Sequence, residues 1–148
     1  MNKKGFTLIE LLVVIAIIGV LSTLAVVALG SARQKANDAK RLSDIKQVQT
    51  ALELYYTDNN SYPTSTAGGD DLGTGSFACI NSAGFGTTGC TSPYMGQVPV
   101  GPSPAEYYEY TSADGSTFTI TAELEAGAGG FGDGVVTATE SGMTGQPL

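Results

Sequence analysis

The first third of the chain is apolar with few interruptions. Residues 6–29 contain only five positions that are not apolar: Thr7, Glu10, Gly19, Ser22 and Thr23. As a helix rising about 1.5 Å per residue, this stretch would be roughly 36 Å long, which exceeds the hydrocarbon core of a bilayer, about 30 Å. The pattern therefore predicts a membrane-spanning helix over residues 6–30.

A second helical pattern follows without a break, because neither Pro nor Gly occurs between Ser31 and Tyr56. Its apolar residues recur at spacings of three or four, which is typical of an amphipathic helix. They are Ala32, Ala36, Ala39, Leu42, Ile45, Val48, Leu52 and Tyr55. Most charged residues, among them Asp38, Arg41 and Asp44, fall off this face. We expect one continuous helix to about residue 57, whose second half holds a small domain; the pattern is too short to favour a free coiled coil.

The rest of the chain changes from turn-forming to strand-forming composition. The cluster 58–60 and the following Tyr62-Pro63 predict the end of the helix. Residues 58–104 are predicted to be a loop, of which residues 64–104 are dominated by Gly, Ser, Thr and Pro. A stretch of about 40 residues without any structure is too long for a compact domain, so we expect short strands or a helical turn within it.

Alternating apolar and polar residues predict strands at 107–111 and 117–124, with a third short strand at 135–137. In the second of these strands Phe118, Ile120, Ala122 and Leu124 share one face. Asp114-Gly115 is a hairpin turn signal between the first two strands. The predicted fold class is α+β: a long N-terminal helix packed on a small antiparallel sheet within residues 105–140.

Charge and composition restrict the function. All seven Lys and Arg residues lie before residue 47, and the formal net charge is −7. This distribution argues against nucleic-acid binding, which needs a basic surface. The sequence contains no His, no Ser/His/Asp set and no phosphate-binding loop motif, so we do not expect an enzyme.

Cys79 and Cys90 are the only cysteines. If they lie outside the cytoplasm, a disulfide is the natural interpretation. Two cysteines without His do not complete a tetrahedral metal site, and a catalytic thiol would lack its usual base.

Glu10 stands out because a carboxylate within an apolar membrane span is costly and indicates a function with a specific partner. If the chain were cut between Gly5 and Phe6, the new amine of Phe6 would lie near the depth of Glu10. In two helices staggered by about one turn, this amine and carboxylate could meet. Two alternatives stay open: a plain membrane anchor, and a secretory signal peptide cleaved around residues 28–32.

Residues 4–15, Lys-Gly-Phe-Thr-Leu-Ile-Glu-Leu-Leu-Val-Val-Ile, resemble the class III signal of type IV pilins and type II secretion pseudopilins. The helix exit at residues 54–64 also resembles the corresponding part of many such proteins. The resemblance implies a leader of residues 1–5, cleavage after Gly5 by a prepilin peptidase, methylation of the Phe6 amine, and a role for Glu10 in aligning an incoming subunit. The family usually carries a Pro in the second half of the membrane helix, and here Val27 stands about where we would look for it.

The resemblance predicts a structural subunit of a type IV pilus-like filament. The implied partners are further copies of the chain, membrane lipid before assembly, the prepilin peptidase, and an inner-membrane assembly platform with its ATPase. Lys3 and Lys4 favour a single-pass protein with its N-terminus in the cytoplasm and residues 31–148 outside. The alternatives are a major pseudopilin of a type II secretion system and, from another class, a membrane-anchored binding or adhesion module.

Residues 127–134 consist almost entirely of Gly and Ala, with Asp133 among them. Because major pseudopilins often bind calcium in C-terminal loops, the resemblance makes Glu125, Asp133 and Glu140 candidate ligands. No EF-hand spacing is present, and a flexible acidic loop without a cofactor is the favoured interpretation.

Overall fold

The computed structural model describes residues 5–148 and divides into two compact units. One helix, α1 (Leu8–Asn59), begins in the first unit, which ends at Gln34, and continues into the second, Lys35–Leu148. The prediction of a single continuous helix ending near residue 57 is confirmed. Asn60 follows α1 in the left-handed conformation (φ 55°), and its N–H bonds the Tyr56 carbonyl oxygen at 2.8 Å, which closes the last turn.

In the first unit, the apolar side chains of α1 are exposed, from Leu8 at 78% to Leu29 at 53%. This part of α1 is long and apolar enough to cross a membrane. An exposed surface of this kind is unstable in water, so lipid or other protein must cover it.

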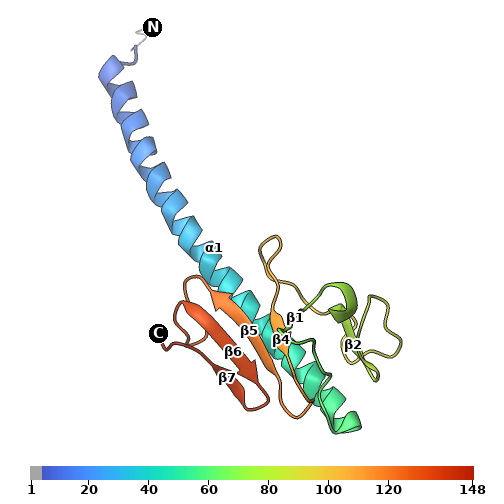
Figure 1. The fold of residues 1–148 in the computed structure, drawn as a ribbon. Helices are drawn as coiled ribbons and strands as arrows, with labels where there is room; N and C mark the ends of the chain where they lie inside the picture. Colours follow the sequence, from blue (N-terminus) through green and yellow to red (C-terminus); the bar gives the residue numbers. More distant parts are fainter. Residues whose placement is uncertain (1–4) are drawn as a thin grey trace. The chain divides into compact units, whose positions relative to one another are not determined.

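In the second unit, α1 packs on a five-stranded antiparallel sheet (Figure 1). The strands follow the order β1-β4-β5-β6-β7. Their bounds are β1 Asp70–Asp71, β4 Glu109–Thr111, β5 Thr119–Leu124, β6 Gly134–Thr139 and β7 Gly142–Thr144. The α+β prediction is confirmed.

The three predicted strands correspond to β4, β5 and β6; β4 and β5 begin two residues later than predicted, and β6 is longer by one residue at its start and two at its end. The alternation in β5 is also confirmed: Phe118, just before it, and Ile120, Ala122 and Leu124 are all buried. Between β4 and β5, Gly115 has φ +76° and lies so close to Tyr62 that an added Cβ would be 2.8 Å from its carbonyl oxygen. This turn therefore requires glycine, and it anchors the helix exit because Tyr62 N–H donates to Gly115 O at 2.8 Å.

The predicted loop contains short structure, as its length required. Besides β1, it forms a 3-10 turn, η1 (Gly75–Phe77), and a small hairpin of β2 (Cys79–Asn81) and β3 (Gly84–Gly86). Cys79 and Cys90 form the predicted disulfide, with Cα atoms 6.2 Å apart. The bond ties the loop after β3 to β2, and β2 itself lies against the core through Ile80, which is fully buried.

The helix face that enters the core differs in part from the prediction. Leu42, Ile45, Val48, Leu52 and Tyr55 are buried as expected. The prediction was wrong for Ala32, Ala36 and Ala39, which are exposed, and for Asp38, Arg41 and Asp44, which are buried. The reason is that the sheet covers only the later part of the predicted apolar face of α1. The segments next to the sheet place Glu106 and Glu125 against the helix, where they pair with Arg41.

Replacing Leu52 by Ala should lower the free energy of unfolding by about 2–5 kcal/mol, because it opens a cavity under a fully buried side chain. Leu54→Ala is the matched control, since Leu54 is 50% exposed, and should change stability by no more than about 0.5 kcal/mol. Denaturant unfolding of the full chain in detergent, followed by the near-ultraviolet circular dichroism of its tyrosines, measures both. Equal losses for the two variants would contradict this packing.

Candidate functional site

The start of α1 carries the residues of the predicted processing site. Gly5, Phe6 and Thr7 precede the helix in non-helical conformation and are exposed. The predicted cleavage point, between Gly5 and Phe6, therefore lies in a stretch of chain free of regular structure. Residues 1–4 of the predicted leader, with Lys3 and Lys4, lie outside the described residues.

Thr7 and Glu10 form a capping box at the first turn of α1. The Thr7 N–H and hydroxyl donate to Glu10 Oε2 at 2.8 and 2.6 Å, and the Glu10 N–H donates to Thr7 Oγ1 at 3.3 Å. Such reciprocal bonds satisfy backbone donors that have no partner at a helix start. The carboxylate of Glu10 is thus held at the helix end, next to the residue that cleavage would turn into the N-terminus.

Sequence reasoning missed this arrangement, although the signal was present. A Ser or Thr followed three residues later by Glu, just before an apolar run, is the sequence signature of a capping box. The predicted partner of Glu10, the amine of Phe6, exists only after cleavage, so the role of Glu10 in subunit register stays a prediction.

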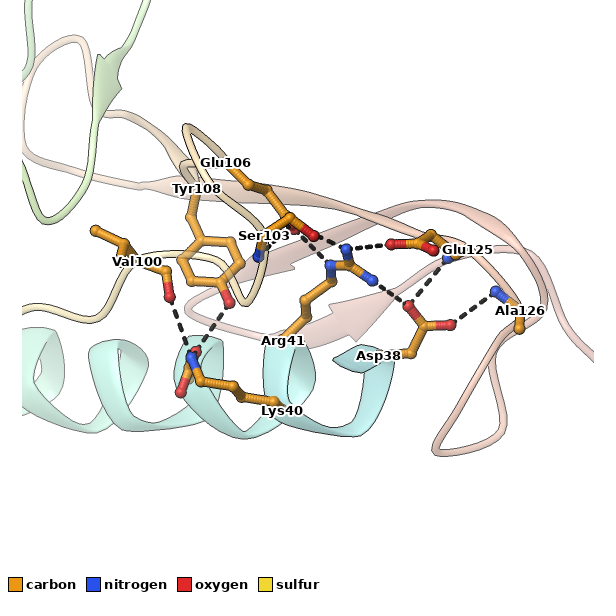
Figure 2. Close-up of polar contacts among 10 residues, drawn as sticks. Asp38, Lys40, Arg41, Val100, Ser103, Glu106, Tyr108, Glu125 and Ala126 are labelled. Atoms are coloured by element: carbon orange, nitrogen blue, oxygen red, sulfur yellow. Dashed lines mark hydrogen bonds and ion pairs between the residues drawn. The ribbon is translucent and has the colours of Figure 1, made fainter. Parts of the chain in front are cut away.

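A second polar site lies at the buried face of α1 in the second unit (Figure 2). Arg41 is 2% exposed and contacts three carboxylates from three parts of the chain. Its Nη1 donates to Asp38 Oδ1 at 2.5 Å, its Nε to Glu106 Oε1 at 2.5 Å and its Nη2 to Glu125 Oε1 at 2.6 Å. A planar guanidinium suits this role because it presents several donors in fixed directions.

Asp38 extends the network to the sheet. Its Oδ1 accepts the Glu125 N–H at 3.0 Å and its Oδ2 accepts the Ala126 N–H at 2.7 Å. The turn after β5 is therefore bonded to α1 by backbone donors as well as by the Glu125 side chain. Together, Asp38 and Arg41 fasten the helix to this turn and to the loop before β4, which contains Glu106.

The bonds of the network shift the pKa values of its members. Hydrogen bonds from Arg41 hold the pKa of Glu106 below its usual range. Burial raises the pKa of Asp38, but the backbone N–H groups of Glu125 and Ala126 and the guanidinium outweigh it, so this pKa is also lowered. The bond to Glu106 raises the pKa of Arg41 further above its already high value. All three shifts favour the charged forms that the network needs.

One turn further along α1, Asp44 links the helix to the sheet in the same manner. Its Oδ2 accepts Lys40 Nζ at 2.5 Å and the Tyr108 hydroxyl at 2.9 Å, and Lys40 also donates to the Val100 carbonyl oxygen at 3.1 Å. Tyr108 is fully buried, so its hydroxyl requires a partner of this kind. Burial, together with the bond to Asp44, raises the pKa of Tyr108.

The candidate calcium ligands are not brought together. Glu125 is bonded to Arg41, while Asp133 and Glu140 are exposed at opposite ends of β6, just before and just after the strand. Within residues 5–148, no three His, Cys, Asp or Glu side chains gather into a group that could hold a metal. The favoured interpretation, an acidic loop without a cofactor, and its alternative, calcium binding through these residues, both remain predictions.

Two family models match the chain, one at its N-terminal segment and one over most of the remainder. The family model of the prokaryotic N-terminal methylation motif matches residues 1–30, and that of type II secretion system protein G matches residues 28–136. No solved structure matches the chain.

Three curated relatives show the range of similarity. Type II secretion system core protein G of Aeromonas hydrophila is 46% identical over 71 residues, or 48% of this chain and 50% of that protein. Its Vibrio cholerae counterpart is 31% identical over 143 residues, or 88% of each chain. The type IV wide pilus major component PilA4 of Thermus thermophilus is 44% identical over 72 residues, or 49% of this chain and 55% of that protein. The chain thus spans about half the length of the Aeromonas and Thermus relatives in these matches.

Arg41→Met should lower the free energy of unfolding by about 3–5 kcal/mol at pH 7, because it leaves Asp38, Glu106 and Glu125 crowded without their cation. Denaturant unfolding of the full chain in detergent measures the loss. The matched control is Arg33→Met on the exposed part of α1, which should stay within about 0.5 kcal/mol of the wild type. A loss of similar size at Arg33 would show that the network does not carry the effect.

The stability difference between wild type and Arg41→Met should depend on pH. Because the pKa values of Asp38 and Glu106 are lowered on folding, their contribution is complete above the unfolded values, about pH 4, and is lost as the pH falls through the folded values. The difference should therefore be largest near pH 7 and shrink below about pH 4. Unfolding curves of both proteins between pH 7 and pH 3 test this, and a difference that grows with acidity would contradict it.

Proposed function

Because the chain belongs to the type II secretion system protein G family, we propose that it is the structural subunit of a type IV pilus-like helical filament, made as a membrane-anchored precursor. The observation that carries this proposal is the exposed apolar part of α1, which begins directly after Gly5-Phe6 and bears a single carboxylate, Glu10. A plain anchor does not need that carboxylate, whereas a segment that must later pair with a new N-terminus does.

Processing makes the subunit competent for assembly. A prepilin peptidase cuts after Gly5, the amine of Phe6 is released and methylated, and Glu10 pairs with such an amine as the subunit enters the filament. The exposed, non-helical backbone at Gly5 and Phe6 supports this step, because a protease needs an accessible extended segment. An inner-membrane platform with its ATPase supplies the work of drawing the helix out of lipid.

Burial of the apolar part of α1 against neighbouring copies stabilises the filament. Each square ångström of apolar surface removed from water contributes about 25 cal/mol, although part of that gain is already present in lipid. The chain is anchored with its N-terminus in the cytoplasm and the second unit outside, where the Cys79–Cys90 disulfide persists. The role is structural and non-catalytic, in keeping with the family.

A second candidate function is specific to protein export. The match to protein G of the type II secretion system covers the extracytoplasmic part of the chain, and the Vibrio cholerae relative aligns over 88% of both chains. These observations favour a short secretion pseudopilus, whereas the similarity to PilA4 supports a surface pilus. Deleting the gene distinguishes them, since the first predicts loss of protein export and the second loss of long external fibres.

Gly5→Leu should abolish maturation, because the peptidase must accommodate the residue before the cut. Intact mass and N-terminal sequencing of the membrane-derived protein should show a wild-type chain that begins at Phe6 and is heavier by one methyl group. The variant should keep its full length and form no filament. Gly19→Leu is the control and should be cut normally, because Gly19 lies within α1 and has no atom near the added side chain.

Two outcomes would contradict the proposed function. A wild-type chain that begins near Ser31 would identify a secretory signal peptide. A wild-type chain left uncut alongside an active prepilin peptidase would identify a simple membrane anchor.

A further inference from the structure

The exposed face of α1 in the second unit carries two lysines that have no partner. Lys35 and Lys46 are exposed, and neither forms an ion pair in the part of the chain that the structure describes. Lys40 and Arg41, by contrast, are committed to carboxylates of their own chain. Lys35 and Lys46 are thus the cations of this unit that remain available to another molecule.

The two lysines lie on one face of the helix. They are 11 residues apart, which is about three turns, so their side chains emerge within about 20° of each other. Between and beside them, Ala39, Ser43 and Thr50 are exposed small residues, and together with Lys46 and Gly129 they line a shallow groove. Small side chains between two long ones leave room for another chain to approach the helix closely.

An uncompensated pair of carboxylates lies on the sheet. Asp71 of β1 and Glu109 of β4 are directly opposite each other in the antiparallel pairing, and both are exposed. Like charges in this position are destabilising. Neither forms an ion pair with any described residue, whereas the neighbouring Asp70 carboxylate is occupied by the N–H and hydroxyl of Thr66, at 2.6 and 2.8 Å.

We propose that these two surfaces meet between copies: the Lys35–Lys46 face of α1 in one subunit receives the Asp71–Glu109 pair of another. This inference rests on the proposed function, because it requires copies to be held side by side. It deepens that function by assigning the contact between extracytoplasmic units, which the apolar part of α1 does not provide.

Charge complementarity supports a second copy as the partner. The chain has a formal net charge of −7, so copies repel one another unless cationic and anionic surfaces are matched. The cationic face and the carboxylate pair lie on different parts of the surface, on α1 and on the β1–β4 edge of the sheet. A contact between two different patches is heterologous, and repeating it builds a ring where the rotation closes and an open helical polymer where it does not, as a filament requires.

Charge reversal tests the pairing in cells that assemble the wild-type filament. Lys46→Glu alone and Glu109→Lys alone should each lower the amount of sheared filament about five-fold, since each sets like charges against each other across every contact. The double variant should restore the wild-type amount. Asp133→Lys is the matched control, because Asp133 is exposed just before β6, which is separated from β4 by β5, and it should leave filament yield unchanged.

The membrane level and cleavage of every variant are measured alongside, so that a folding or processing defect is recognised. Single variants with wild-type filament yield would overturn the pairing. So would a double variant that stays defective, or an effect confined to Lys46→Glu, which would identify anionic lipid headgroups as the partner of that face. A wild-type chain that is cleaved but forms no filament would contradict the proposed function itself. The outcomes above would contradict only the pairing, because in them the wild type still forms filaments.

Discussion

A helix that is apolar on every side cannot remain exposed to water, and this constraint governs the chain from Leu8 to Leu29. Lipid before assembly and neighbouring helices after it are the two environments that satisfy the constraint. The same helix then changes character and becomes amphipathic, so that its second part is covered by its own chain. The second unit therefore buries its apolar side chains within its own fold. The apolar part of α1 in the first unit depends on lipid or on other chains to cover it.

The second part of α1 is held by charges as well as by apolar packing. We expect Arg41 to be difficult to replace by another residue. Its guanidinium is bonded to carboxylates from the helix, from the loop before β4 and from the turn after β5. Apolar contacts such as those of Ile45 and Leu52 are not directional and would tolerate small slips of the helix on the sheet. The ion pairs at Arg41 admit one position, so we infer that they specify where the helix lies, and removing Arg41 is costly chiefly because it leaves three carboxylates without their cation.

Local patterns were sufficient to predict the elements but not the polar contacts between them. The strict alternation from Phe118 to Leu124 identified β5, and the run without Pro or Gly identified α1. The local pattern predicts exposed side chains for Asp38 and Arg41. It cannot reveal their partners, Glu106 and Glu125, because these lie more than 60 residues away in the chain. The one local clue was the acid–base spacing of three between them. Likewise β1 is two residues long and exists only because β4 lies beside it.

At the other end of α1, the capping box and the proposed register role of Glu10 draw on the same physical property. A carboxylate at a helix start interacts favourably with the free N–H groups there, so its cost in an apolar setting is reduced. The bonds from Thr7 do not involve the leader, so the proposed cleavage would leave both of their partners, Thr7 and Glu10, in the chain. The proposed cleavage would add a cation one residue before Thr7, close to a carboxylate that is already oriented. The chain thus holds one partner of the proposed ion pair in place, and the other would exist only after the leader is removed.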